Sequence, residues 1–219
     1  MVDERPAFVR ALAARLSRHE ALPAEAAGTE AADTEAADTE AAGDTRKRAA
    51  VVLALRGETV DAEALFIVRA TDERDPWSGH VALPGGREEP GDADLLETAL
   101  RELREETGLG LAREEVVGRL DELRPVSRHI PRIAITPFVA WRAQLSGVRR
   151  NAEIERHFWM PLSALREPGR RSTLVLRRSG DEMTFPTIEY AGHTVWGLTY
   201  SIVQNFLTLL EADEAASGG

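Results

Sequence analysis

Residues 83–111, LPGGREEPGDADLLETALRELREETGLGL, constrain the fold of this chain more than any other stretch. The stretch begins with a Pro-Gly-Gly turn, continues through an acidic loop and ends in a predicted helix that Gly108 closes. Asp94 precedes the first helical turn and is expected to cap it. Helical spacing of apolar residues predicts the stripe that packs on the rest of the protein: Leu95, Leu96, Ala99, Leu100 and Leu103.

The same helix carries three acids on a different face. Glu105 and Glu106 follow Glu102 by three and four residues, so the three carboxylates share one side of the helix. Arg101 lies four residues before Glu105 and is expected to pair with it. An exposed acidic face is usually only solvated, but the preceding Gly85–Gly86 turn favours a binding site, because glycines allow close backbone approach. Clustered carboxylate oxygens suit Mg²⁺ or Mn²⁺.

Composition and charge exclude several classes of protein. The 219 residues have a net charge of −10, but eight acids and no Lys or Arg lie between residues 20 and 44, and removing them leaves −2. The chain therefore lacks the basic footprint expected for binding a nucleic acid polymer. It has no cysteine, which excludes disulfides and thiolate metal sites. We find neither a stretch of about 20 apolar residues nor a signal-peptide pattern, so no membrane association and a cytoplasmic location are expected.

The chain divides into four predicted segments. Residues 1–21 are expected to contain an amphipathic helix, with Phe8, Val9, Leu12 and Leu16 at helical spacing. Residues 22–45 contain a Thr-Glu-Ala-Ala-Asp repeat without large apolar residues, which predicts a disordered, solvated linker; a specific acidic docking segment is the alternative. Residues 46–212 form the predicted globular domain, and residues 213–219 a flexible tail.

Within the globular domain, strand and helix patterns alternate irregularly. Runs rich in β-forming residues predict strands at 49–55, 64–69, 80–83, 116–123, 133–141, 153–160, 173–176, 184–190 and 193–195. Pro137 lacks an N–H group, so the strand around it is expected at a sheet edge or at a bulge. Short and long helices are expected at 161–165 and 198–211. These patterns predict an α+β fold with a mixed sheet.

The central stretch resembles the signature of the Nudix hydrolases, G-x5-E-x7-R-E-U-x-E-E-x-G-U, in which U is a bulky aliphatic residue. The second half of the signature matches without a gap, from Arg101 to Leu109. The first half departs from it, because counting from Gly86 places Asp92 at the first acidic position, with eight residues before Arg101 instead of seven. Asp92 or Asp94 therefore stands where the family has Glu. The same longer loop occurs in the branch that includes the coenzyme A pyrophosphatases.

The resemblance implies a fold and an activity. The implied fold is the Nudix α/β/α sandwich with a mixed β-sheet, and the implied reaction is hydrolysis of a nucleoside diphosphate linked to another group. Glu102, Glu105 and Glu106 would hold Mg²⁺, with Mn²⁺ as the alternative. Glu102, Glu105 and Arg101 are the implied catalytic residues. A homodimer is also consistent with the family.

Expectations for the substrate are broader. Gly85 and Gly86 are expected to lie against the substrate, and Arg69 and Arg128 are expected to bind its phosphates. Coenzyme A or an acyl-coenzyme A is the first candidate. His80 stands where the branch has Gln, which keeps a nucleotide sugar, a dinucleotide or an oxidised nucleotide as alternatives. A binding module without catalysis is a third reading, against which the intact acidic residues argue.

Overall fold

A computed structural model describes residues 5–19, 47–71, 79–125, 132–178 and 181–211. The predicted acidic linker and the C-terminal tail lie outside these residues. Within the described residues, no helix is both long and apolar enough to cross a membrane. The helices and longer strands are α1 (Ala7–Arg18), β1 (Lys47–Arg56), β2 (Glu63–Arg69), α2 (Leu95–Thr107), β6 (Ile133–Arg142), β7 (Ile154–Pro161), α3 (Leu162–Arg166), β8 (Arg171–Arg178), β9 (Asp181–Tyr190) and α4 (Gly197–Glu211), and the short strands are β3 (Val81–Ala82), β4 (Gly85–Arg87), β5 (Val116–Arg119) and β10 (His193–Val195).

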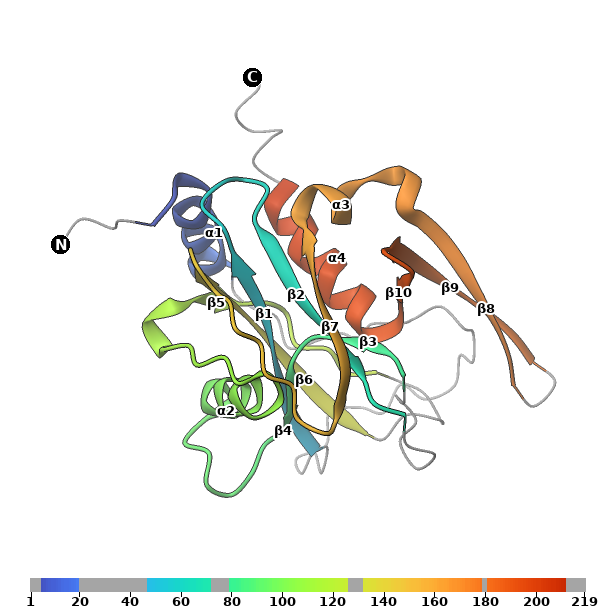
Figure 1. Cartoon of the computed structure of the whole chain (residues 1–219), viewed down its shortest axis with the longest axis horizontal. Helices are drawn as coiled ribbons and strands as arrows, with labels where there is room; N and C mark the ends of the chain where they lie inside the picture. The colour runs from blue at the N-terminus through green and yellow to red at the C-terminus, as the bar shows by residue number, and fades with distance from the viewer. Residues whose placement is uncertain (1–4, 20–46, 72–78, 126–131, 179–180, 212–219) are drawn as a thin grey trace.

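A mixed seven-stranded sheet forms the centre of the molecule (Figure 1). Strand β1 pairs in parallel with β6 over its whole length and in antiparallel with β2 only at Leu55 and Arg56. On the same edge of β1, residues 49–51 pair with β4. Strand β3 pairs with β2. Residues 81–87 therefore pass from β2 to β1, and this crossing places Gly85 and Gly86 at one end of the sheet.

Helices cover both faces of this sheet. Alternate residues of β1 point to opposite sides, as a strand requires. Val52 and Ala54 pack with Leu103 of α2, whereas Leu53 and Leu55 belong to the cluster that includes α1 and α4. The result is the expected α+β, three-layered α/β/α sandwich with a mixed sheet.

Helix α1 packs against the sheet through its apolar stripe. Val9, Leu12 and Leu16 are buried, and a side chain at Gly118 of β5 would collide with Leu16. Arg15 donates hydrogen bonds to the carbonyl oxygens of Leu209 and Leu210, at 2.5 and 2.7 Å. These carbonyls lie at the end of α4, where a helix leaves acceptors unsatisfied. The amphipathic pattern of α1 thus produces a helix that closes one end of the sandwich.

A second, three-stranded antiparallel sheet has the order β10-β9-β8. Its β8–β9 hairpin projects from the main body (Figure 1). The side chain of Phe158 on β7 stacks on His193 of β10, with ring centroids 4.4 Å apart. This contact joins the two sheets.

Of the two positions predicted for Pro137, a sheet edge or a bulge, the sheet edge is wrong. Strand β6 lies inside the sheet, between β1 and β5. The carbonyl oxygen of Pro137 accepts a hydrogen bond from the N–H of Leu120, just beyond the end of β5. Regular β5 pairing begins at Phe138, so the missing N–H of Pro137 removes no bond from a continuous ladder. The irregularity lies in β5, where the pairing register shifts between Val116 and Gly118.

Candidate active site

Helix α2 is fixed at both ends by its own sequence. The Asp94 side chain accepts a hydrogen bond from the Glu97 N–H at 2.8 Å, which satisfies one unpaired donor of the first turn. At the other end, Gly108 adopts a left-handed conformation with φ of 69°. Ala99, Leu100 and Leu103 are buried against the sheet, as the stripe predicts. These contacts fix the rotation of α2 about its axis and therefore the direction in which its acidic face points.

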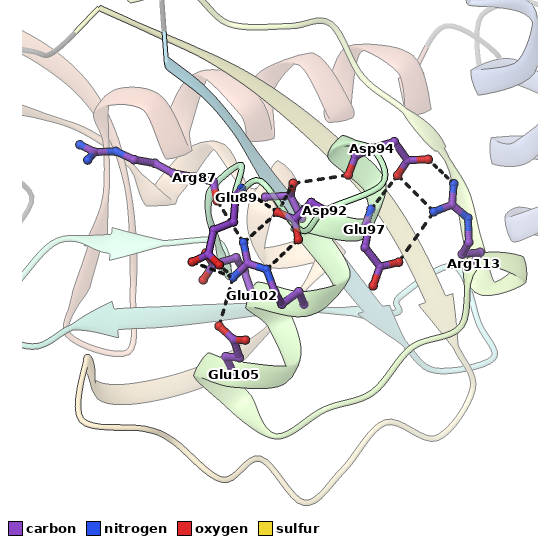
Figure 2. Close-up of polar contacts among 10 residues, drawn as sticks. Arg87, Glu89, Asp92, Asp94, Glu97, Glu102, Glu105 and Arg113 are labelled. Carbon is purple, nitrogen blue, oxygen red and sulfur yellow. Dashed lines mark hydrogen bonds and ion pairs between the residues drawn. The ribbon is translucent and has the colours of Figure 1, made fainter.

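Arg101 connects the acidic loop to the helix, because it binds Asp92 of the loop and Glu102 and Glu105 of the helix, the three acids labelled in Figure 2. Its guanidinium donates two hydrogen bonds to the Asp92 carboxylate, at 2.9 and 3.0 Å, and one to the carbonyl oxygen of Arg87, at 3.0 Å. Asp92 also accepts hydrogen bonds from the Thr98 hydroxyl and the Glu89 N–H. The hydrogen bonds from Arg101 are the main reason that the pKa of Asp92 is held well below its usual range.

These contacts define the role of the unusual first acidic position. The Asp92 side chain is 4% exposed and its oxygens are engaged by Arg101, Thr98 and the loop backbone. Asp94 caps the helix and pairs with Arg113 at 2.6 Å. Both acids therefore shape the loop, and the longer loop leaves the helical acids in place.

Arg101 also contacts two of the three helical glutamates. Its guanidinium lies 3.0 Å from Glu102 and 3.1 Å from Glu105, which confirms the expected Arg101–Glu105 pair. The glutamate side chains differ in exposure, because Glu105 is 52% exposed and Glu102 is 17% exposed. Glu106 is buried, with 2% of the residue exposed. The acidic face thus runs from solvent into the protein.

The two glycines of β4 lie directly against the inner carboxylates. The Gly85 N–H donates to the Glu106 carboxylate at 2.9 Å. Gly85 has a φ of 156°, and a Cβ atom there would lie 2.5 Å from the Cα of Val51. A Cβ atom on Gly86 would lie 2.5 Å from the carboxylate carbon of Glu102. Position 85 therefore needs glycine because β1 lies so close to it, and position 86 needs glycine to admit the Glu102 carboxylate.

Burial and mutual repulsion make the inner carboxylates hard to ionise. Desolvation is the main cause that raises the pKa of Glu106 to about 8, and Glu102 and Glu153 add to it, while the Gly85 N–H opposes it. Burial also raises the pKa of Glu102, against the opposing effect of Arg101. Shifts of this kind are typical of functional sites, although structural ion networks also produce them.

Glu153 is a candidate residue that the sequence prediction missed. Its charge raises the pKa of both Glu102 and Glu106. The Asn151 N–H, two residues earlier, donates to the Glu106 carbonyl oxygen at 3.1 Å, which places this segment at the end of α2. The Ala70 N–H donates to the Glu153 carbonyl oxygen at 2.7 Å, and the Glu153 N–H donates to the Asn151 side chain at 2.9 Å. The signal in the sequence is weak, since it consists of an Asn followed two residues later by an acid before a strand.

The predicted phosphate-binding arginines fall in different parts of the chain. Arg69 ends β2, and its positive charge lowers the pKa of Glu106. Its N–H donates to the carbonyl oxygen of His80 at 3.0 Å. The prediction for Arg128 lies outside the described residues.

The donor set suits a divalent cation. The charges of Glu102 and Glu153 help to raise the pKa of Glu106, an effect that a cation beside these carboxylates would oppose. In the described part of the chain, no three acidic or histidine side chains converge closely enough to hold a metal ion by themselves. The Glu102 carboxylate accepts a hydrogen bond from Arg101, and the Glu106 carboxylate accepts one from the Gly85 N–H. Mg²⁺ commonly takes one or two carboxylates together with substrate phosphates and water, so these residues fit its requirements.

Known proteins share both the sequence and the fold. The NUDIX domain model matches residues 45–178. The human mitochondrial coenzyme A diphosphatase NUDT8 is 34% identical over 167 residues, which cover 74% of this chain and 69% of that protein. An uncharacterised Nudix hydrolase, NudL of Yersinia pestis, is 30% identical over 164 residues, covering 74% of this chain and 78% of the relative.

Solved structures support the same fold. A MutT/nudix family protein from Enterococcus faecalis has a TM-score of 0.54 at 15% identity, covering 79% of this chain and 65% of its own. A Nudix hydrolase from Alicyclobacillus acidocaldarius has a TM-score of 0.52 at 21% identity, covering 78% of this chain and 96% of its own. Together with the sequence matches, these findings show that the chain belongs to the Nudix hydrolase family, in the branch similar to the coenzyme A pyrophosphatases.

Proposed function

We propose that this protein is a Mg²⁺-dependent hydrolase that cleaves the diphosphate linkage of a nucleoside diphosphate derivative, with coenzyme A or an acyl-coenzyme A as the first candidate. The observation that carries the proposal is the pair of inner carboxylates, Glu102 and Glu106, held against Gly85 and Gly86 at the end of the sheet. The resemblance to a coenzyme A diphosphatase supports the choice of substrate.

The acidic residues have distinct proposed roles. Glu102, Glu105 and Glu106 hold Mg²⁺, with Mn²⁺ as a substitute, and the bound ion supplies charge neutralisation and a lowered pKa of bound water. Glu102 and Glu105 also act in catalysis. Glu153 is the proposed proton acceptor for the attacking water, because its charge acts on both inner carboxylates and the residue is exposed.

The basic residues and glycines position these groups and the substrate. Arg101 orients Glu102 and Glu105 and fixes the loop through Asp92. Arg69 binds a phosphate oxygen, since its charge already acts on the nearby Glu106. Gly85 and Gly86 are proposed to lie against the substrate, beside the carboxylates that they contact. Arg128 is proposed as a further phosphate ligand.

Product analysis tests the proposal directly. The purified chain with Mg²⁺ or Mn²⁺ is incubated with coenzyme A, an acyl-coenzyme A, NADH, ADP-ribose and dinucleoside polyphosphates. We expect release of a nucleoside phosphate from a diphosphate-linked substrate, and ¹⁸O-labelled water identifies the phosphorus that is attacked. Turnover of another member of the panel in preference to coenzyme A would favour the alternative substrates. No turnover of any compound would favour a binding module without catalysis.

The remaining parts of the chain have simpler proposed roles. We propose that residues 22–45 link an N-terminal helical segment to a catalytic domain of residues 46–212, and that residues 213–219 form a tail. Deleting residues 24–44 is expected to leave the kinetic constants unchanged; a large loss would contradict the linker role. A cytoplasmic location, a homodimer and small-molecule substrates without nucleic acid or membrane partners complete the proposal. Cell fractionation and light scattering test the first two.

A further inference from the structure

The second sheet has two faces, and only one of them packs on the core of the molecule. Ile188 of β9 and Val195 of β10 are directly paired and belong to a large buried cluster. Side chains alternate between the two faces along a strand, and directly paired residues share a face. The opposite face of the β8–β9 hairpin therefore carries two apolar cross-strand pairs, Leu174 with Phe185 and Leu176 with Met183.

These four residues form an apolar surface on a part of the chain that projects from the main body (Figure 1). We call it the hairpin stripe: Leu174, Leu176, Met183 and Phe185. Each residue is half-buried, and none belongs to an apolar core cluster of the described residues. The other face of the hairpin is more polar and includes the Arg177–Glu182 ion pair at 2.9 Å. Grouped apolar side chains outside a core commonly mark a binding surface.

Aromatic contacts connect the hairpin stripe to the main sheet. The Phe185 ring makes an edge contact with Trp196, with centroids 5.4 Å apart, and Trp196 makes one with His80 at 4.6 Å. Trp196 directly follows β10, which lies next to β3 of the main sheet. The His80 carbonyl oxygen accepts a hydrogen bond from the Arg69 N–H at 3.0 Å. The stripe is therefore continuous, through two rings, with the end of β2.

The end of β2 adjoins the segment that carries a proposed catalytic residue. The N–H of Ala70, just beyond β2, donates to the Glu153 carbonyl oxygen at 2.7 Å. Two residues before Glu153, the Asn151 N–H donates to the Glu106 carbonyl oxygen at 3.1 Å. A substrate bound at these residues by its diphosphate can extend past Trp196 onto the hairpin stripe.

We propose that the hairpin stripe binds an apolar acyl chain carried by the substrate, on the group linked to the nucleoside diphosphate. The inference rests on the proposed function and selects, within its substrate class, acyl derivatives over free coenzyme A. An alkyl chain gains free energy when these side chains shield it from water. A sugar or a second nucleotide would instead place polar groups against side chains that offer no strong hydrogen bond.

Kinetics across a series of acyl chain lengths test the proposal. Acetyl-, butyryl-, hexanoyl- and octanoyl-coenzyme A differ only in their number of methylene groups. Complete burial of one methylene raises affinity about fourfold, so an open surface that covers one side of the chain should give about twofold for each. We expect kcat/KM of the wild-type chain to rise about sixtyfold from acetyl- to octanoyl-coenzyme A. The rise should come mainly from a lower KM, because the chain lies away from the reacting phosphorus.

Substitutions on the two faces of the hairpin provide matched variants. Leu174→Ser/Met183→Ser removes one side chain from each cross-strand pair of the stripe and should reduce the rise to less than about fourfold. Val175→Ser changes an apolar residue that is 46% exposed on the opposite face and should keep the sixtyfold rise of about twofold per methylene. Melting temperatures identify a variant that does not fold, and Leu176→Ser alone, with a smaller expected reduction, then replaces the double variant.

Two kinetic outcomes would overturn the proposal. One is a series without dependence on chain length in an active wild-type chain, and the other is an unchanged dependence in folded stripe variants. A second copy of the chain is the competing occupant of the stripe, and light scattering detects it. A dimer that the stripe variants dissociate, with no change in chain-length dependence, would assign the stripe to an interface between copies and refute the acyl site.

Binding without turnover separates this inference from the proposed hydrolysis. Isothermal titration calorimetry in chelator compares butyryl- with octanoyl-coenzyme A. We expect the octanoyl derivative to bind about 16-fold tighter, a ratio that the double variant abolishes and that added salt does not weaken, because no charge produces it. This result in a chain that hydrolyses nothing would refute the proposed function but leave the acyl site intact. Equal affinity for both ligands would refute the acyl site even in an active hydrolase.

Discussion

Two pairs of acids within the same loop and helix are held in opposite electrostatic states. Asp92 and Asp94 meet arginines and N–H groups, and their pKa values are lowered, that of Asp94 to about 2 chiefly by hydrogen bonds from Arg113. Glu102 and Glu106 lie deeper, and burial raises the pKa of each. The contacts of the loop acids outweigh their burial, whereas burial outweighs the effects of Arg101 on Glu102 and of Arg69 on Glu106.

This difference separates acids that build the structure from acids that serve the site. A carboxylate whose charge is stabilised by its surroundings contributes to folding, and its loss is expected to lower stability. A carboxylate that is buried near others opposes folding while it is charged. Substitutions of the loop acids should therefore lower stability more than activity, and substitutions of the inner helical acids should lower activity more than stability.

The largest effect is expected for Glu106→Gln. Removing this proposed metal ligand should lower kcat/KM by about 10²–10⁴-fold, comparable to the loss of a major catalytic group. The Gln oxygen can still accept the hydrogen bond from the Gly85 N–H, so the fold is expected to persist. Steady-state kinetics and thermal unfolding of the same preparation measure both. Glu114→Gln, at an exposed position outside the site, is the control and should change neither. A collapse of folding in Glu106→Gln would make the inner acids structural.

Asp92→Asn, in contrast to Glu106→Gln, is expected to lower stability more than activity. The change weakens both hydrogen bonds from Arg101 and leaves that guanidinium without its main partner. Breaking the pair should cost about 2 kcal/mol, the usual cost of leaving a shielded hydrogen-bonding group unsatisfied, because Asp92 lies in a surface loop and not in the core. This corresponds to a fall in melting temperature of about 4–8 °C. Glu89→Gln is the matched control, since Glu89 is 66% exposed and lies 3.8 Å from Arg101. Unchanged stability of Asp92→Asn would remove the distinction between the two pairs.

The stability of the metal-free protein should depend on pH through Glu106. Its pKa is about 8 in the folded chain and about 4.5 in the unfolded chain, so the folded state binds the proton more tightly. The contribution of the protonated group to stability is complete below pH 4.5 and is lost as the pH rises toward 8. Glu106→Gln should therefore gain stability over the wild type with rising pH, on the order of 1–3 kcal/mol. Thermal unfolding in chelator at pH 5 and pH 8.5 measures the difference, and a constant difference would contradict the assignment.

Local sequence patterns predict the elements of this fold well. The cap at Asp94, the left-handed Gly108 and the buried stripe of α2 follow from neighbouring residues, and the structure confirms each. The edge position for Pro137 failed because the sheet order depends on pairing between segments far apart in the chain. Strand β1 pairs with β6 more than 80 residues later, and no local pattern encodes that partner.

The candidate site is predictable only in part for a related reason. The spacing of Glu102, Glu105 and Glu106 places them on one helix face, but it does not reveal that their exposure ranges from buried to half-exposed. Several acids of the loop could have paired with Arg101, and only the folded loop selects Asp92. Glu153 joins the site because the chain passes between the end of α2 and the end of β2, a contact that depends on tertiary packing.

The smallest effect is expected for Asp94→Ala, which tests whether the loop acids act through separate contacts. Asp94 caps α2 and also pairs with Arg113, whose side chain is 46% exposed. Loss of a helix cap costs about 1 kcal/mol, whereas an exposed ion pair contributes only a few tenths, because solvent screens it. Asp94→Ala should therefore lower the melting temperature by about 2–4 °C, while Arg113→Gln should lower it by less than about 1 °C. Equal shifts in the two variants, measured by thermal unfolding, would mean that the ion pair and not the cap holds this end of the helix. Activity should remain close to wild type in both variants, because α2 keeps its position through Arg101 and its buried stripe.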